Sequence, residues 1–98
     1  MNYIRSEGEK EIANRIKVAL YAYAYEIMNK PLTTDAEYDT LARSIRPLMV
    51  TGRPVEDYFF GEEFSPSTGQ WIHKHPDLEG IARLYDKFAA QIAARNVS

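Results

Sequence analysis

Two carboxylates and a tyrosine occupy one short segment of this chain at helical spacing. Asp35, Tyr38 and Asp39 stand at positions i, i+3 and i+4, so a helix would place them on one face. Tyr21 and Tyr25 precede them, one turn apart, near the end of an earlier helix-like segment. Aromatic rings attract flat organic cations, and carboxylates add negative charge to such a site. The pattern is typical of a shallow cation site, although packing at the edge of a core would use the same residue types.

The order of features around these residues resembles a known domain. The chain reads as a tyrosine-rich helix, a turn at Pro31 and then Asp-Ala-Glu-Tyr-Asp at residues 35–39. Without a gap, this order is similar to the N-terminal helical domain of NAD-dependent DNA ligases, over about residues 10–48. In that family the domain recognises the nicotinamide mononucleotide half of NAD during ligase adenylation. The resemblance implies a helical hairpin with NAD or nicotinamide mononucleotide as its ligand.

The resemblance also assigns a cofactor-binding set. It implies that Tyr25 and Tyr38 face the nicotinamide ring, while Asp35 and Asp39 hold polar groups of the nicotinamide and the ribose. Glu26 departs from the family pattern, because the family commonly has a histidine at this place. A carboxylate here would repel the phosphate of the nucleotide. Glu26 therefore belongs to the candidate site but opposes nucleotide binding.

The sequence does not contain the residues that would let this chain act as a ligase alone. The family's catalytic lysine lies in a Lys-x-Asp-Gly motif, and no lysine of this chain has that context. Cysteine is absent, which excludes thiolate metal sites, disulfides and thiol nucleophiles. His73 and His75 form a His-x-His pair, but a third well-spaced metal ligand is not evident. We expect no catalytic residue, no metal site and no ligation activity.

A second group of aromatic residues offers another function. Tyr58, Phe59 and Trp71 could anchor a protein partner, because exposed aromatic side chains dominate many interfaces. The same residues could instead form the second half of the core. We favour a small non-catalytic interaction module built on a ligase-like hairpin, of a kind frequent in phage and prophage genomes, with an unknown protein partner. The alternative is a stand-alone domain that binds NAD or nicotinamide mononucleotide.

Composition limits the class of protein. The chain has 98 residues, of which 45% are hydrophobic and 27% charged, as in an ordinary globular domain. A net charge of −2 gives no broad basic surface, so we expect no direct nucleic-acid binding. The longest apolar-leaning run, residues 18–25, is far too short to cross a membrane. We expect a cytoplasmic protein with one mainly α-helical domain.

Hydrophobic periodicity predicts three helices. The hairpin spans residues 1–48, with a first helix at about 6–29 and a second that begins at Thr34 and ends near Pro47. Thr34 and Glu37 form a capping-box pattern at the start of the second helix. The first helix shows an apolar face with four- and three-residue spacing, and its members are Ile12, Ile16, Leu20, Tyr23 and Ile27.

The rest of the chain divides at about residue 75. Residues 49–75 form an aromatic connecting segment, and part of it, within 55–75, could be a small two-stranded β-ribbon or an ordered loop. Residues 76–98 contain the third helix, predicted at about 76–95. Its apolar positions, at three- and four-residue spacing, are Leu78, Ile81, Tyr85, Phe88 and Ile92. We expect Ile81 and Phe88 to lie in the core.

Overall fold

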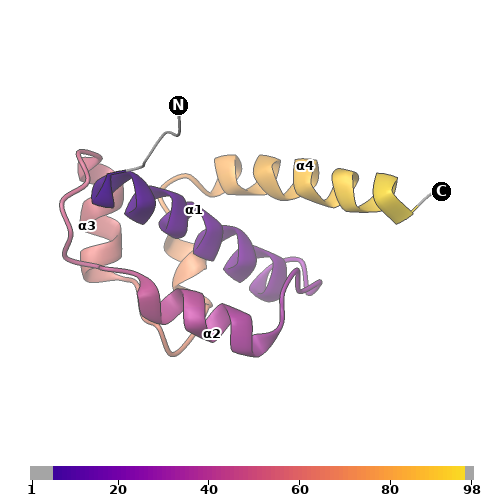
Figure 1. The fold of residues 1–98 in the computed structure, drawn as a ribbon, viewed down its shortest axis with the longest axis horizontal. Helices are drawn as coiled ribbons and strands as arrows, with labels where there is room; N and C mark the ends of the chain where they lie inside the picture. Colours follow the sequence, from indigo (N-terminus) through magenta and orange to yellow (C-terminus); the bar gives the residue numbers. More distant parts are fainter. Residues whose placement is uncertain (1–5, 97–98) are drawn as a thin grey trace.

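The computed structural model describes residues 6–96, and it confirms the predicted mainly α-helical class. The elements are α1 (Glu7–Glu26), α2 (Asp35–Ser44), α3 (Pro54–Glu62), the short 3-10 helix η1 (Gln70–Lys74) and α4 (Leu78–Asn96). Helix α1 is central: α2, η1 and α4 all pack against it, and α3 stands near its N-terminal end (Figure 1). None of the described helices is long and apolar enough to cross a membrane.

The predicted hairpin of α1 and α2 is present, with a shorter first helix than expected. Helix α1 ends at Glu26 and not near Asn29, which adopts a left-handed backbone with φ of 53°. Asparagine tolerates this conformation better than most residues. The Lys30 N–H donates to the Ala24 carbonyl at 2.8 Å and closes the helix end. The chain is therefore reversed before Pro31, and α2 returns alongside α1.

The start of α2 follows the sequence prediction closely. Thr34 is the N-cap, its hydroxyl accepts the Glu37 N–H at 3.1 Å, and the Glu37 carboxylate reaches back to Thr34. The helix ends at Ser44, ahead of Pro47, and Leu48 lies beyond it with 86% of its surface exposed.

The buried face of α1 is wider than the predicted apolar stripe. Val18, Ala19 and Ala22 are almost completely buried, whereas Ile16 is 39% exposed. Elements on several sides of α1 cause this difference, because α2, η1 and α4 each cover a separate part of its circumference. Small alanine side chains lie where the neighbouring elements approach α1, and a sequence pattern built from large apolar residues does not include them.

The middle segment contains no β-strand within the described residues, so the β-ribbon alternative is not found, and α3 and η1 are instead joined by a loop. Pro54 occupies the first turn of α3, where its missing N–H leaves no hydrogen bond unmade. The turn also contains Glu56 and Asp57, which suit the positive end of a helix dipole. Phe59 and Phe60 are both buried, and η1 places Trp71 beside them, with ring centroids 6.1 and 5.7 Å apart. The aromatic run therefore reflects one buried face of a helix and not strand alternation.

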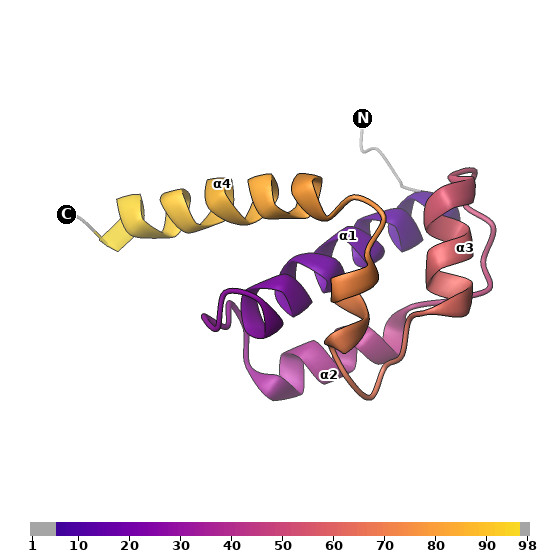
Figure 2. The same cartoon turned by 180° about the vertical axis from the view of Figure 1, so that it is seen from behind.

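The last helix is confirmed, but only its first half lies in the core. Ile81 and Tyr85 are buried, and the Tyr85 ring lies 5.6 Å from the Tyr23 ring. Phe88 is 36% exposed, so the prediction that it is a core residue is wrong. Both ribbon views show the reason: α4 continues beyond the end of α1, which leaves its C-terminal half without a partner helix (Figures 1 and 2).

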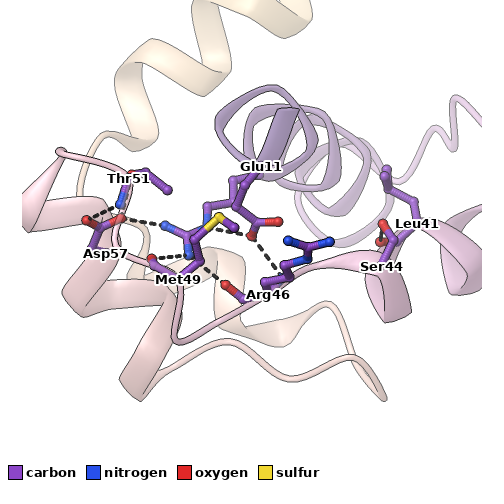
Figure 3. Close-up of polar contacts among 8 residues, drawn as sticks. Glu11, Leu41, Ser44, Arg46, Met49, Thr51 and Asp57 are labelled. Atoms are coloured by element: carbon purple, nitrogen blue, oxygen red, sulfur yellow. Dashed lines mark hydrogen bonds and ion pairs between the residues drawn. The ribbon is translucent and has the colours of Figure 1, made fainter. Parts of the chain in front are cut away.

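A buried ion-pair network connects α1 to the chain between α2 and α3. Arg15 and Glu11 are each 3% exposed, and Arg15 Nε lies 2.8 Å from Glu11 Oε2. Arg15 Nη1 donates to Asp57 Oδ1 at 2.6 Å, and Nη2 donates to the carbonyls of Arg46 and Met49 at 2.8 and 3.0 Å (Figure 3). The guanidinium also lies over a buried aromatic ring, with 5.1 Å from its carbon to the ring centroid. A single arginine thus fixes two other segments.

Asp57 completes this network on the α3 side. Its carboxylate accepts the Thr51 N–H at 2.9 Å and the Thr51 hydroxyl at 2.6 Å, in addition to Arg15. Partial burial alone would raise the pKa of Asp57, but the hydrogen bonds from Thr51 and the Arg15 charge outweigh it and hold the pKa below its usual value. No local pattern in the sequence marks this network, because polar residues one turn apart on a helix are usually exposed.

Candidate functional site

The five residues of the predicted cofactor-binding set line one pocket. It has a volume of about 600 Å³ and lies between the end of α1, the start of α2 and the loop that precedes η1. The members of the set are Tyr25, Glu26, Asp35, Tyr38 and Asp39. The structure therefore brings together residues from two helices, as the spacing and the hairpin predicted.

The wall formed by α1 is aromatic. Tyr21 and Tyr25 lie one turn apart, and Tyr25 is 55% exposed, so its ring is open to a ligand. Glu26 follows directly and ends the helix. Lys17 lies over the Tyr21 ring, with its Nζ 5.9 Å from the centroid, but it does not line the pocket.

The wall formed by α2 is acidic, and its helix end is already capped. Thr34 and Glu37 satisfy each other at the N-terminus, and the hydrogen bonds from Thr34 lower the pKa of Glu37. Asp39 pairs with the exposed Arg43 one turn along, with Arg43 Nε 3.2 Å from Oδ2. Asp35 makes no hydrogen bond or ion pair within the described residues. The capping box satisfies the N–H groups of Thr34 and Glu37, which reduces the donors that this helix end could offer to a phosphate.

The Tyr38 hydroxyl is a polar group without a partner. Its oxygen is buried and forms no hydrogen bond among the described residues. Burial raises the pKa of Tyr38, and the nearby Glu26 charge raises it further. The Trp71 indole N–H offsets part of this, but it donates to the Thr68 carbonyl at 2.8 Å and leaves the tyrosine unsatisfied. A buried unpaired hydroxyl is costly, so Tyr38 is a polar group of this site whose partner the described residues do not supply.

The third wall of the pocket, residues 66–69, was missed by the sequence analysis. A Cβ atom at Gly69 would lie 3.2 Å from Glu26 Cγ and 3.5 Å from the Tyr38 hydroxyl, so the loop approaches both residues closely. Trp71 fixes this loop through its hydrogen bond to Thr68. A glycine at position 69 is a sequence signal for a close approach of the backbone to another group, but only the tertiary structure shows which groups it approaches.

All the charged side chains that line the pocket are negative. Glu26, Asp35 and Asp39 contribute three carboxylates, whereas no lysine, arginine or histidine lines it. Together with the tyrosine rings, this arrangement suits a flat organic cation. A phosphate placed here would meet carboxylates and no compensating base.

Two of the three predicted partner anchors are in the core. Phe59 and Trp71 are each 5% exposed, which favours the core alternative for these two residues over the partner-anchor alternative. Their rings pack with Phe60 and Phe64, since one helix and one 3-10 turn close over α1. Tyr58, at 72% exposed, is the member of the set that remains accessible.

The two histidines have separate environments. No group of three metal-ligating side chains lies together within the part of the chain that the structure describes. His75 packs edge-on against Phe59 at 5.2 Å, and its Nδ1 accepts the Asp77 N–H at 3.0 Å. Burial lowers the pKa of His75, although the charges of Asp77 and Glu56 act in the opposite direction. His73 is exposed. His75 therefore has a structural place at the start of α4.

Comparison with known proteins adds no family. No protein-family description, curated protein or solved structure matches the chain. A ligand for the pocket is therefore inferred from the residues that line it.

Proposed function

We propose that this chain is a small binding module whose pocket takes a flat organic cation of the nicotinamide riboside type. One observation carries the proposal: tyrosines and three carboxylates from two helices line a single pocket, closed by the loop 66–69, that contains no basic side chain. The oxidised nicotinamide ring is planar and positively charged, which matches both features. The resemblance to the ligase domain supports the same ring and the same residues.

Each wall has a role in this proposal. The open Tyr25 ring stacks on the pyridinium, and Asp35 supplies charge and accepts hydrogen bonds from ribose hydroxyls. Asp39 contributes charge that is partly offset by Arg43. Tyr38 adds a second aromatic side chain to the wall formed by α2.

The pocket discriminates against the phosphate of the nucleotide. For two unit charges about 6 Å apart, repulsion is roughly 0.7 kcal/mol in water and about 3 kcal/mol at an effective dielectric constant of about 20. That range corresponds to about a threefold to a hundredfold change in affinity. Glu26 and its neighbours therefore favour the nucleoside over nicotinamide mononucleotide and NAD. The cytoplasmic location expected from the sequence remains part of the proposal.

A titration watched by amide chemical shifts tests where the ligand binds. Nicotinamide riboside should shift residues of the α1 end, the α2 start and the loop 66–69. Tyr25→Ala should weaken binding at least tenfold, about 1.4 kcal/mol, because it removes the stacking surface. Tyr58→Ala is the matched control, since Tyr58 is also exposed but lies outside the pocket. Equal affinities for the two variants, or no shifts at millimolar ligand, would contradict the proposal.

A further inference from the structure

The carboxylates that line the pocket differ in whether the protein already pairs them. Asp39 has Arg43 as its partner, with Arg43 Nε 3.2 Å from Oδ2, so part of its charge is offset. Glu26 and Asp35 line the same pocket and make no hydrogen bond or ion pair within the described residues. Two carboxylates of one pocket therefore have oxygens that the described part of the protein leaves open to a donor.

The lysines near the pocket do not supply that donor. Lys17 lies over the Tyr21 ring and acts, after the hydrogen bonds from Thr34, to lower the pKa of Glu37, which does not line the pocket. Lys30 is exposed on the turn that follows α1 and makes no ion pair within the described residues. Neither lysine lines the pocket. A group with a positive charge and N–H donors therefore has to come from a ligand.

The guanidinium group of arginine combines both properties with a planar shape. The oxidised nicotinamide ring is also planar and cationic, but the ring itself carries no N–H donor. A guanidinium group has N–H donors around its edge for carboxylates, and its faces stack on aromatic rings. Tyr25, at 55% exposed, offers an open ring, and Glu26 and Asp35 offer the acceptors.

The remaining lining of the pocket suits the rest of an arginine side chain. Ala22, Pro31 and Leu32 give it an apolar part, along which the aliphatic stem of arginine can pack. An arginine within a polypeptide is favoured over the free amino acid, whose α-carboxylate would meet the same acidic wall that opposes a phosphate. Tyrosine and arginine are also the residues that most often dominate protein interfaces.

We propose that the pocket is the recognition site for an arginine side chain of a partner protein. The inference rests on the proposed function, a pocket for a planar organic cation, and names the partner that would bring this cation. Nicotinamide riboside and the arginine side chain would then compete for one site.

Two blocked tripeptides, acetyl-Gly-Arg-Gly-amide and acetyl-Gly-Lys-Gly-amide, are the probes, titrated into the whole chain and followed by amide chemical shifts. The arginine peptide should shift the end of α1, the start of α2 and the loop 66–69. It should bind at least about threefold more tightly than the lysine peptide, because an ammonium group has no planar face and no fork of donors. Asp35→Asn should weaken its binding at least about threefold, whereas Glu62→Gln should not. Glu62 is the matched control, since it is also exposed and loses the same charge but lies outside the pocket.

Other results would overturn the inference. Equal binding of the two peptides, or equal effects of the two variants, would reduce the interaction to general charge attraction. Tighter binding of free arginine than of the arginine peptide would assign the pocket to the amino acid and not to a protein. Shifts with nicotinamide riboside but not with the arginine peptide would reject the arginine site and leave the proposed function intact. Shifts at the pocket with the arginine peptide alone would support the arginine site and reject the nicotinamide ligand.

Discussion

Replacing Arg15 with methionine should destabilise the fold by about 3–5 kcal/mol, as expected when one partner of a buried ion pair is removed. Arg15 contacts two carboxylates and two backbone carbonyls at 2.6–3.0 Å, and 4% of its side chain is exposed. Methionine fills much of the same volume, so the loss arises from Glu11 and Asp57 left without a cation and not from a cavity. Against a typical total of about 5–15 kcal/mol, the variant should be close to unfolding.

Urea denaturation followed by far-ultraviolet circular dichroism measures this loss. Arg46→Met is the matched control: its side chain is 61% exposed and pairs with Glu7 at 3.5 Å, so it should change stability by less than about 1 kcal/mol. Glu11→Gln in the Arg15→Met background should recover part of the stability, because a neutral amide is less costly to bury than an unpaired carboxylate. A loss below about 1 kcal/mol for Arg15→Met, or no recovery in the double variant, would refute the reasoning.

Three further outcomes follow from the site and the core. Glu26→His should tighten binding of nicotinamide mononucleotide, because a positive or neutral ring replaces a charge that repels phosphate; unchanged affinity in calorimetry would contradict this. Burial lowers the pKa of His75 in the folded state. Its neutral form therefore contributes stability above the pKa of the unfolded chain, about 6.5, and this stability is lost as the pH falls through the lower pKa of the folded chain. Urea midpoints at about pH 7.5 and about pH 5.5 should differ less for His75→Asn than for the parent, whereas His73→Asn should behave like the parent. Phe88→Ala should lower stability by less than about 1 kcal/mol, against about 3–5 kcal/mol for the buried Tyr85→Ala; equal thermal shifts would contradict the exposure of Phe88.

Local signals in the sequence were sufficient for the hairpin and for the two helical walls of the pocket. The capping box at Thr34 fixes where α2 begins, and this sets the phase that turns Asp35, Tyr38 and Asp39 to one side. A short link at Pro31 then brings α1 back beside them. Both features depend on neighbours in the sequence, which is why they were predictable.

The features that were missed depend on contacts between distant segments. Arg15 binds Asp57, forty-two positions away, and no local pattern distinguishes it from a surface arginine. Phe59 and Phe60 are consecutive, and both are buried because two positions about 100° apart fit within one buried face of α3, while Tyr58 lies on the exposed side. Gly69 approaches Glu26 only in the folded chain. Phe88 follows the helical period of the core but lies where α4 has passed the end of α1.

The charge preference of the pocket is the central claim, and one comparison of affinities tests it most directly. Nicotinamide riboside and its reduced form share the same ribose and carboxamide, but reduction removes the positive charge of the ring. Calorimetric titration of the whole chain should give at least about tenfold tighter binding for the oxidised cation, equivalent to about 1.4 kcal/mol. Equal binding of the two forms, or tighter binding of the neutral ring, would contradict a pocket built from tyrosines and the carboxylates of Glu26, Asp35 and Asp39.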